Sequence, residues 1–113
     1  MLDITLELKN TILDTFKIDK DEITIGRNSA NDITIDNLAV SDRHARIVRD
    51  KTGYYLEDLG STNGTLVDGR PITRIGLGPQ QEITIGKHTL DVRTTGSKDA
   101  SSDFARTMKI DRS

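Results

Sequence analysis

Three short polar motifs in this 113-residue chain combine the residue types that can bind a phosphate ester. Arg27 offers a planar fork of N–H donors suited to phosphate oxygens. Ser41 and Thr62 offer hydroxyl donors, and the side-chain amide of Asn63 can hold the main chain of a ligand. These residues belong to the motifs "GR" at 26–27, "SDRH" at 41–44 and "GSTNGT" at 60–65. One arginine, two hydroxyls and loop amides predict a site for a single dianionic phosphate ester.

The elements that must position these motifs are short β-strands. Apolar residues alternate with polar ones over 2–8, which is typical of a half-buried strand. Further β-type runs lie at 15–18, 22–25, 32–35, 44–48, 54–58, 65–67, 70–73, 82–85 and 88–92. This pattern predicts an all-β, antiparallel sandwich of roughly ten strands. Each motif lies at the end of a predicted strand, and the loops of a sandwich cluster at its two ends, so the motifs can meet there.

Composition excludes several classes of function. The chain has 34% hydrophobic and 30% charged residues and a formal net charge of -2, which does not provide the basic field of a nucleic-acid-binding protein. Aromatic residues make up only 4%, too few for a platform on which bases stack. There is no cysteine, and the two histidines lie in no ligand cluster, so neither a metal nor a cofactor is expected. No apolar run is long enough for a membrane span, and we expect a cytoplasmic protein.

The chain changes character near residue 96. The segment 96–113, "GSKDASSDFARTMKIDRS", is rich in serine and charged residues and has only scattered apolar ones. Such a segment cannot offset the entropy lost on ordering, so we expect a folded domain over 1–95 and a disordered tail or linker over 96–113. Within the tail, Thr107 follows Arg106 in a segment that, being disordered, would be open to a kinase, which makes it a candidate phosphorylation site.

The five letters "EITIG" occur twice, at 22–26 and 82–86. The sequences that follow diverge at once, whereas a structural duplication should extend over about 20 residues or more. The repeat therefore indicates two strands of similar composition. We expect the first copy to present Arg27, and the second to enter a hairpin whose tight turn is Gly86-Lys87, like the turn predicted at Asp68-Gly69.

The motifs, in this order and spacing, resemble those of the forkhead-associated (FHA) domain family. The similarity covers about residues 2–94 and includes the segments "NDITI" and "YYLEDLGSTNGT". It implies an eleven-stranded antiparallel β-sandwich whose apical loops bind phosphothreonine peptides. By this resemblance Arg27, Ser41 and Thr62 would hold the phosphate, and Asn63 would hold the peptide backbone.

The same resemblance assigns supporting roles to three further residues. Gly26 and His44 would shape the loops that present the arginine and the serine, and Gly64 would shape the turn after the asparagine. The implied function is a phosphothreonine-dependent interaction module acting downstream of a Ser/Thr kinase, with no catalysis of its own. Phosphorylated Thr107 could then occupy the site in the same chain or in a second copy.

Asp42 departs from the commonest family pattern, in which a neutral or basic residue follows the serine. Its carboxylate is repulsive to a nearby phosphate. Solvent screening should keep the penalty to about 1 kcal/mol or less if the side chain points outward.

Two other functions compete with this interpretation. Ser41, His44 and Asp58 supply the residue types of a hydrolytic triad, but Ser41 is not in a G-x-S-x-G elbow and the spacing aims the serine and the histidine in different directions. A phosphate-independent interaction or assembly module on the same fold is the alternative. It would be expected if Arg27 or Ser41 were missing, and both are present.

Overall fold

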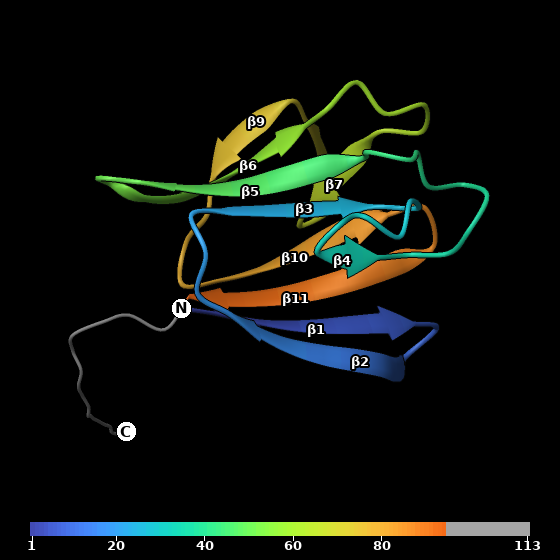
Figure 1. Ribbon diagram of the computed structural model, residues 1–113, viewed down its shortest axis with the longest axis horizontal. Helices are drawn as coiled ribbons and strands as arrows, with labels where there is room; N and C mark the ends of the chain where they lie inside the picture. Colours follow the sequence, from blue (N-terminus) through green and yellow to red (C-terminus); the bar gives the residue numbers. More distant parts are fainter. Residues whose placement is uncertain (95–113) are drawn as a thin grey trace.

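Eleven strands form two packed sheets in the computed structural model, which describes residues 1–94 (Figure 1). In chain order the strands are β1 Leu2–Leu8, β2 Thr11–Ile18, β3 Glu22–Gly26, β4 Ile33–Thr34, β5 Ala45–Asp50, β6 Gly53–Asp58, β7 Thr65–Val67, β8 Arg70–Ile72, β9 Arg74–Gly76, β10 Gln80–Ile85 and β11 His88–Thr94. The predicted all-β sandwich of about eleven short strands is confirmed. The tail expected over 96–113, with Thr107, lies outside the described residues.

The six-stranded sheet has the order β2-β1-β11-β10-β7-β8, and the five-stranded sheet has the order β4-β3-β5-β6-β9. Neighbouring strands run antiparallel, with one difference from the expected pattern: the two-residue β4 lies parallel to the end of β3. This pairing places Ile25 beside Ile33 and folds the β3–β4 loop back over the strand that ends at Gly26.

The core consists of the inward-facing residues of both sheets. Period-2 alternation produces it, because every second side chain of a strand points to the same face. On β1 the buried residues are Leu2, Ile4 and Leu6, and on β3 they are Ile23 and Ile25. The remaining buried apolar residues are Ile33, Ile35, Val40, Ala45, Ile47, Leu56, Val67, Ile83, Ile85, Leu90 and Val92.

Two strands differ from the sequence-based expectation. β2 begins at Thr11 rather than at residue 15, and its first part shows no alternation because Ile12 and Leu13 lie exposed on the edge of the sheet. The predicted run 70–73 corresponds to β8, but β9 was not predicted: the chain crosses between the sheets at Thr73, so that β8 and β9 belong to different sheets.

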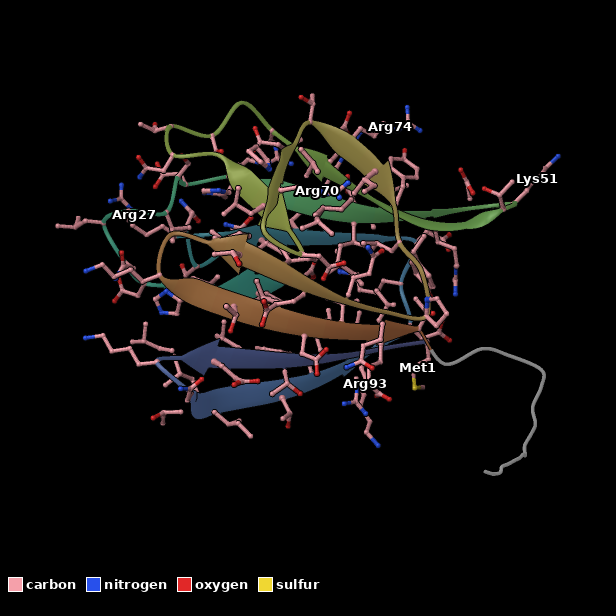
Figure 2. All side chains as sticks on the ribbon, turned by 180° about the vertical axis from the view of Figure 1, so that it is seen from behind. Met1, Arg27, Lys51, Arg70, Arg74 and Arg93 are labelled. Atoms are coloured by element: carbon pink, nitrogen blue, oxygen red, sulfur yellow. The ribbon has the colours of Figure 1, made fainter. Side chains whose placement is uncertain are left out.

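The loops that carry the three polar motifs lie at one end of the sandwich. In Figure 1 the end of β3, the start of β5 and the β6–β7 loop all lie on the right, with the β10–β11 turn next to them. Figure 2 shows the molecule from behind, with Arg27 at this end and Lys51, in the β5–β6 hairpin, at the other. The fold therefore brings together motifs that are up to 38 positions apart in the chain, from 27 to 65.

Candidate functional site

The end of β3 is bound directly to the "SDRH" segment by main-chain hydrogen bonds. The amide of Arg27 donates to the carbonyl of Ser41 at 2.9 Å, and the amide of His44 donates to the carbonyl of Ile25 at 2.9 Å. Gly26 lies under this crossing: a Cβ there would be 2.2 Å from the carbonyl oxygen of Asp42. The absence of a side chain at position 26 thus allows the two segments to approach closely.

His44 connects the serine loop to the β6–β7 loop. It is fully buried, and its ring nitrogens have partners on both sides. Nδ1 accepts a hydrogen bond from the amide of Ser41 at 3.2 Å, and Nε2 lies 2.8 Å from the carbonyl oxygen of Gly64. Because Nδ1 is an acceptor, the ring carries its proton on Nε2, which donates to Gly64. The histidine therefore holds the two loops at a fixed distance.

Asp58, at the end of β6, shapes the β6–β7 loop from within. One carboxylate oxygen accepts from the hydroxyls of Ser61 and Thr65, at 2.5 and 2.7 Å, and the other accepts from the amides of Gly60 and Ser61, both at 3.0 Å. Burial raises the pKa of Asp58, but the hydrogen bonds from Ser61, Thr65 and Gly60 together outweigh it, so the pKa lies below its ordinary value. An ionised Asp58 thus orders the loop that carries Thr62 and Asn63.

The structure brings Arg27, Ser41, Thr62 and Asn63 around one hollow of about 140 Å³, which the segment 38–40 also lines. The hydroxyl oxygen of Ser41 accepts a hydrogen bond from the amide of Thr62 at 3.0 Å, which leaves its own proton free to donate. The side-chain nitrogen of Asn63 donates to the carbonyl of Ala39 at 2.7 Å. A planar cation, a hydroxyl and an anchored amide thus converge on one point at the surface.

Asp42 is exposed, but its carboxylate is paired with Arg27. Its Oδ1 lies 3.2 Å from Nη2 and 3.4 Å from Nε of Arg27. The Asp42 side chain is 67% exposed, whereas that of Arg27 is 36% exposed, so the pair lies at the rim of the hollow. The arginine keeps its remaining N–H donors for another acceptor.

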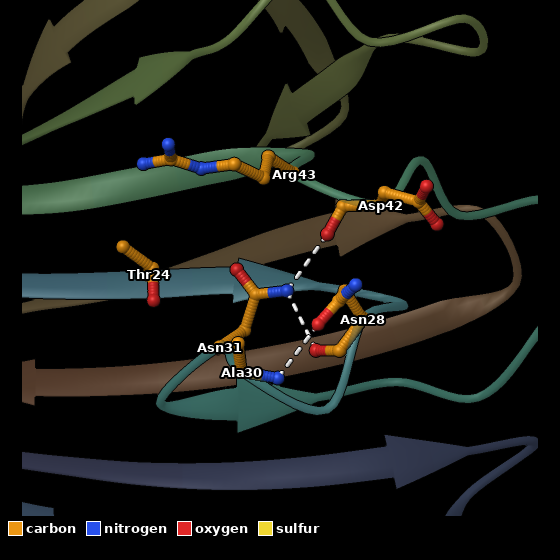
Figure 3. A pocket seen from close by; sticks show the side chains of 6 residues that line it. All are labelled: Thr24, Asn28, Ala30, Asn31, Asp42 and Arg43. Atoms are coloured by element: carbon orange, nitrogen blue, oxygen red, sulfur yellow. Dashed lines mark hydrogen bonds between the residues drawn. The ribbon is translucent and has the colours of Figure 1, made fainter.

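A second cavity, of about 420 Å³, lies behind the Asp42 segment and is lined by Thr24, Asn28, Ala30, Asn31, Asp42 and Arg43 (Figure 3). Asn31 crosses it, and its side-chain nitrogen donates to the carbonyls of Asn28 and Asp42, each at 2.7 Å. Asn31 and the carbonyl of Ala39 also support the site, and neither was predicted as a support. The segment "NDITI" contains Asn31 and was the one sequence signal for that residue. No sequence signal marks a main-chain acceptor such as the carbonyl of Ala39.

The residues of the hypothetical hydrolytic triad do not form a relay. Nδ1 of His44 is bound to a main-chain amide and Nε2 to a main-chain carbonyl, so neither reaches the hydroxyl of Ser41. The carboxylate of Asp58 is bound to the β6–β7 loop rather than to the histidine. Among residues 1–94, no group of three or more acidic or histidine side chains is placed to hold a metal ion, and none of the structure described there is a helix able to cross a membrane.

Curated relatives share the segment that carries these motifs. The chain is 40% identical over 85 residues to an oxoglutarate dehydrogenase inhibitor of Corynebacterium jeikeium, covering 75% of this chain and 58% of that protein. It is 35% identical over 88 residues to the glycogen accumulation regulator GarA of Mycobacterium tuberculosis, covering 78% and 54% of the two chains. The chain thus spans little more than half of the length of these relatives.

Solved structures have the same fold. One, from a structural and functional analysis of phosphothreonine-dependent FHA domain interactions, has a TM-score of 0.73 and 29% identity, covering 84% of this chain and 99% of that one. Another, EmbR of Mycobacterium tuberculosis in complex with a low affinity phosphopeptide, has a TM-score of 0.74 and 27% identity, covering 87% of this chain and 26% of that one. The family model of the FHA domain matches residues 23–86, which include every motif of the site. The chain belongs to the FHA domain family.

Proposed function

We propose that this protein binds threonine-phosphorylated segments of partner proteins in the hollow formed by Arg27, Ser41, Thr62 and Asn63. The observation that carries the proposal is the convergence of these four residues, from three separate loops, on one surface point. A phosphothreonine side chain carries a charge of about −1.5 to −2 and three acceptor oxygens, which match a guanidinium and nearby hydroxyl and amide donors.

Each residue has a distinct role in this proposal. Arg27 pairs with the phosphate through donors not engaged by Asp42. The free hydroxyl protons of Ser41 and Thr62 bind phosphate oxygens. Asn63 is anchored through its nitrogen to Ala39, which leaves its carbonyl oxygen to accept an amide of the peptide backbone.

Gly26, His44 and Gly64 support the site from below. Gly26 allows the arginine and serine segments to cross, and His44 holds the serine loop against the carbonyl of Gly64. Gly64 itself has φ of 83°, a left-handed conformation that closes the loop after Asn63. In this proposal the protein performs no catalysis and needs no cofactor. The names of two curated relatives, an inhibitor and a regulator, support a role without catalysis.

The wider role is a link between an upstream Ser/Thr kinase and a protein assembly, in the cytoplasm. The names of the curated relatives suggest control of central metabolism, and the partner here would be a phosphorylated enzyme or regulator. Fractionation of cells followed by phosphorylation-dependent pull-down of the wild-type protein would identify both the compartment and the partner.

The test of the binding function is a degenerate phosphothreonine peptide library screened against the purified protein. We expect selected peptides to bind, their unphosphorylated forms not to bind, and phosphoserine forms to bind about 4-fold more weakly, because one methyl buried against the site is worth about 0.8 kcal/mol. Equal binding of phosphorylated and unphosphorylated peptides would instead indicate the phosphate-independent module and would overturn the proposal.

Phosphorylation of Thr107 is proposed as a way to regulate the same site. From Gly96 to Thr107 the chain has 11 steps, which extend to at most roughly 36–40 Å, and we propose docking either in the hollow of the same chain or in that of a second copy. Phosphothreonine installed at position 107 should shift the amide resonances of Arg27, Ser41 and Asn63 or increase the mass in solution. If neither changes, Thr107 is not a ligand of this domain.

A further inference from the structure

The cation of the proposed phosphate site is already paired with an acid. Arg27 is the one charged residue that lines the hollow, within the described part of the chain. Its guanidinium is bound through Nε and Nη2 to Oδ1 of Asp42. A phosphothreonine brings about −1.5 to −2 charges, so together with Asp42 it exceeds the single positive charge of Arg27. A further cation near the rim would offset the remaining negative charge when a ligand is bound.

Neither Arg43 nor the arginines held in ion pairs elsewhere in residues 1–94 supply this charge. Arg43 follows Asp42 directly, but Figure 3 shows its guanidinium directed along β5, away from the Asp42 carboxylate. Arg46, Arg49 and Arg93 pair with acidic residues outside the hollow. The balancing charge can therefore come from the solution or from the ligand.

Asp42 is well placed to accept a cation from a ligand. Its side chain is 67% exposed, and its Oδ2 accepts no hydrogen bond from any residue that the structure describes. Only Oδ1 is used by Arg27, so a second donor can bind the carboxylate without breaking the existing pair. The carboxylate faces outward at the rim, where a peptide bound in the hollow would pass.

We propose that Asp42 makes this site selective for phosphothreonine peptides that carry Arg or Lys within about three residues of the phosphothreonine. This inference rests on the proposed function and specifies its ligand. A basic side chain of the ligand binds Oδ2 of Asp42. Arg27 and this side chain then face two anionic groups, the phosphate and the Asp42 carboxylate. Peptides without a basic residue still bind, but Asp42 weakens them by like-charge repulsion.

The Asp42 side chain can be changed without disturbing the loop. Apart from the side-chain pair with Arg27, the contacts of this residue run through its main-chain carbonyl, which accepts hydrogen bonds from Asn28 and Asn31 at 3.3 and 2.7 Å. Figure 3 shows that carbonyl directed into the cavity while the carboxylate points the opposite way. Asp42→Asn therefore removes the charge and leaves these contacts in place. Asp14→Asn, on the edge strand β2, removes the same charge from a different part of the molecule and is the matched control.

The test is an arginine scan of a library-selected phosphothreonine peptide, with Arg or Ala at each of the three positions on either side of the phosphothreonine. Binding is measured at about 50 mM and about 500 mM salt. In the wild type and in Asp14→Asn, Arg at the best position should tighten binding by about 3- to 10-fold at low salt, and less at high salt. In Asp42→Asn this gain should fall below about 2-fold, while the neutral peptide binds equally well or up to about 5-fold more tightly.

The inference and the function fail in different ways. If Arg improves binding equally in the wild type and in Asp42→Asn at every position, Asp42 does not read a cation of the ligand, although phosphothreonine binding stands. If the wild type binds no phosphothreonine peptide at all, the proposed function itself is wrong. Asp42→Lys is a further check: it should reverse the preference, so that Glu beside the phosphothreonine becomes more favourable than Arg.

Discussion

At the scale of the residue, identical local sequence does not mean identical function. Arg27 and Lys87 both follow the letters "EITIG", at the ends of β3 and β10. Arg27 lines the hollow with Ser41, whereas Lys87 belongs to the two-residue turn between β10 and β11. The difference arises from the neighbouring strands: the end of β3 is covered by the serine loop, and the end of β10 continues into a hairpin.

The first prediction compares these two cations. A charge-assisted, partly buried contact between Arg27 and phosphate should contribute about 2–4 kcal/mol, or roughly 30- to 1,000-fold in affinity. Arg27→Ala should therefore nearly abolish binding of a phosphothreonine peptide, as measured by calorimetry, with little change in the melting temperature. Lys87→Ala is the control and should bind almost as the wild type does. Equal losses for both variants would contradict the placement of the phosphate.

At the scale of the element, the β10–β11 hairpin does more than close the sheet. Its turn residue Gly86 has φ of 62°, and a Cβ added there would lie 3.3 Å from Cβ of Ala39 and 3.7 Å from Cγ2 of Val40. Ala39 is the residue whose carbonyl anchors the side chain of Asn63. The turn after the second "EITIG" therefore lies against the 39–40 segment of the serine loop, although the sequence predicted no functional link between the two copies.

The second prediction follows from this contact. Gly86→Ala should cost about 1–2 kcal/mol of stability through the left-handed backbone and should also displace Ala39, so that phosphopeptide affinity falls by about 3- to 10-fold. Gly69→Ala is a matched control, because Gly69 has φ of 84° but nothing within 4 Å of its added Cβ. It should lose similar stability and keep its affinity. Amide shifts in Gly86→Ala that, away from the turn itself, are confined to residues 39, 40 and 63 would show that the effect passes through Ala39. Equal phosphopeptide affinities of the two variants would refute this effect of Gly86 on the site.

The strands were predictable where apolar and polar residues alternate clearly, and less so where this alternation is weak. β1, β3, β5 and β10 alternate clearly because each has one face in the core. The first part of β2 could not be found, because an edge strand with exposed apolar residues has no alternation to detect. In the site, residue types identified Arg27 and Ser41, but the Arg27–Asp42 pair depends on how two loops cross, which no local pattern encodes.

At the scale of the whole molecule, the core contains a titratable group near the binding end. His88 begins β11 directly after the Gly86-Lys87 turn, pairs in register with Leu8 and Ile85, and is 6% exposed. Its Nδ1 is buried without a hydrogen-bond partner among the described residues. Burial lowers the pKa of His88, because a charged imidazolium would be poorly solvated between the sheets.

The last prediction is a loss of stability in mild acid. In the unfolded chain His88 takes up a proton as the pH falls through about 6.5, whereas the buried ring in the native state stays neutral to lower pH. The unfolded state then binds more protons, so the contribution of His88 to the free energy of unfolding should decrease as the pH falls below about 6.5 and level off below the native pKa of this ring. Urea unfolding of the wild type and of His88→Phe at pH 7.5 and 5.5 measures this, and the variant should show the smaller difference between the two conditions. An NMR titration of the His88 ring is the independent check. A native pKa at or above 6.5 would mean that the ring is solvated, and that the pH dependence of stability arises elsewhere.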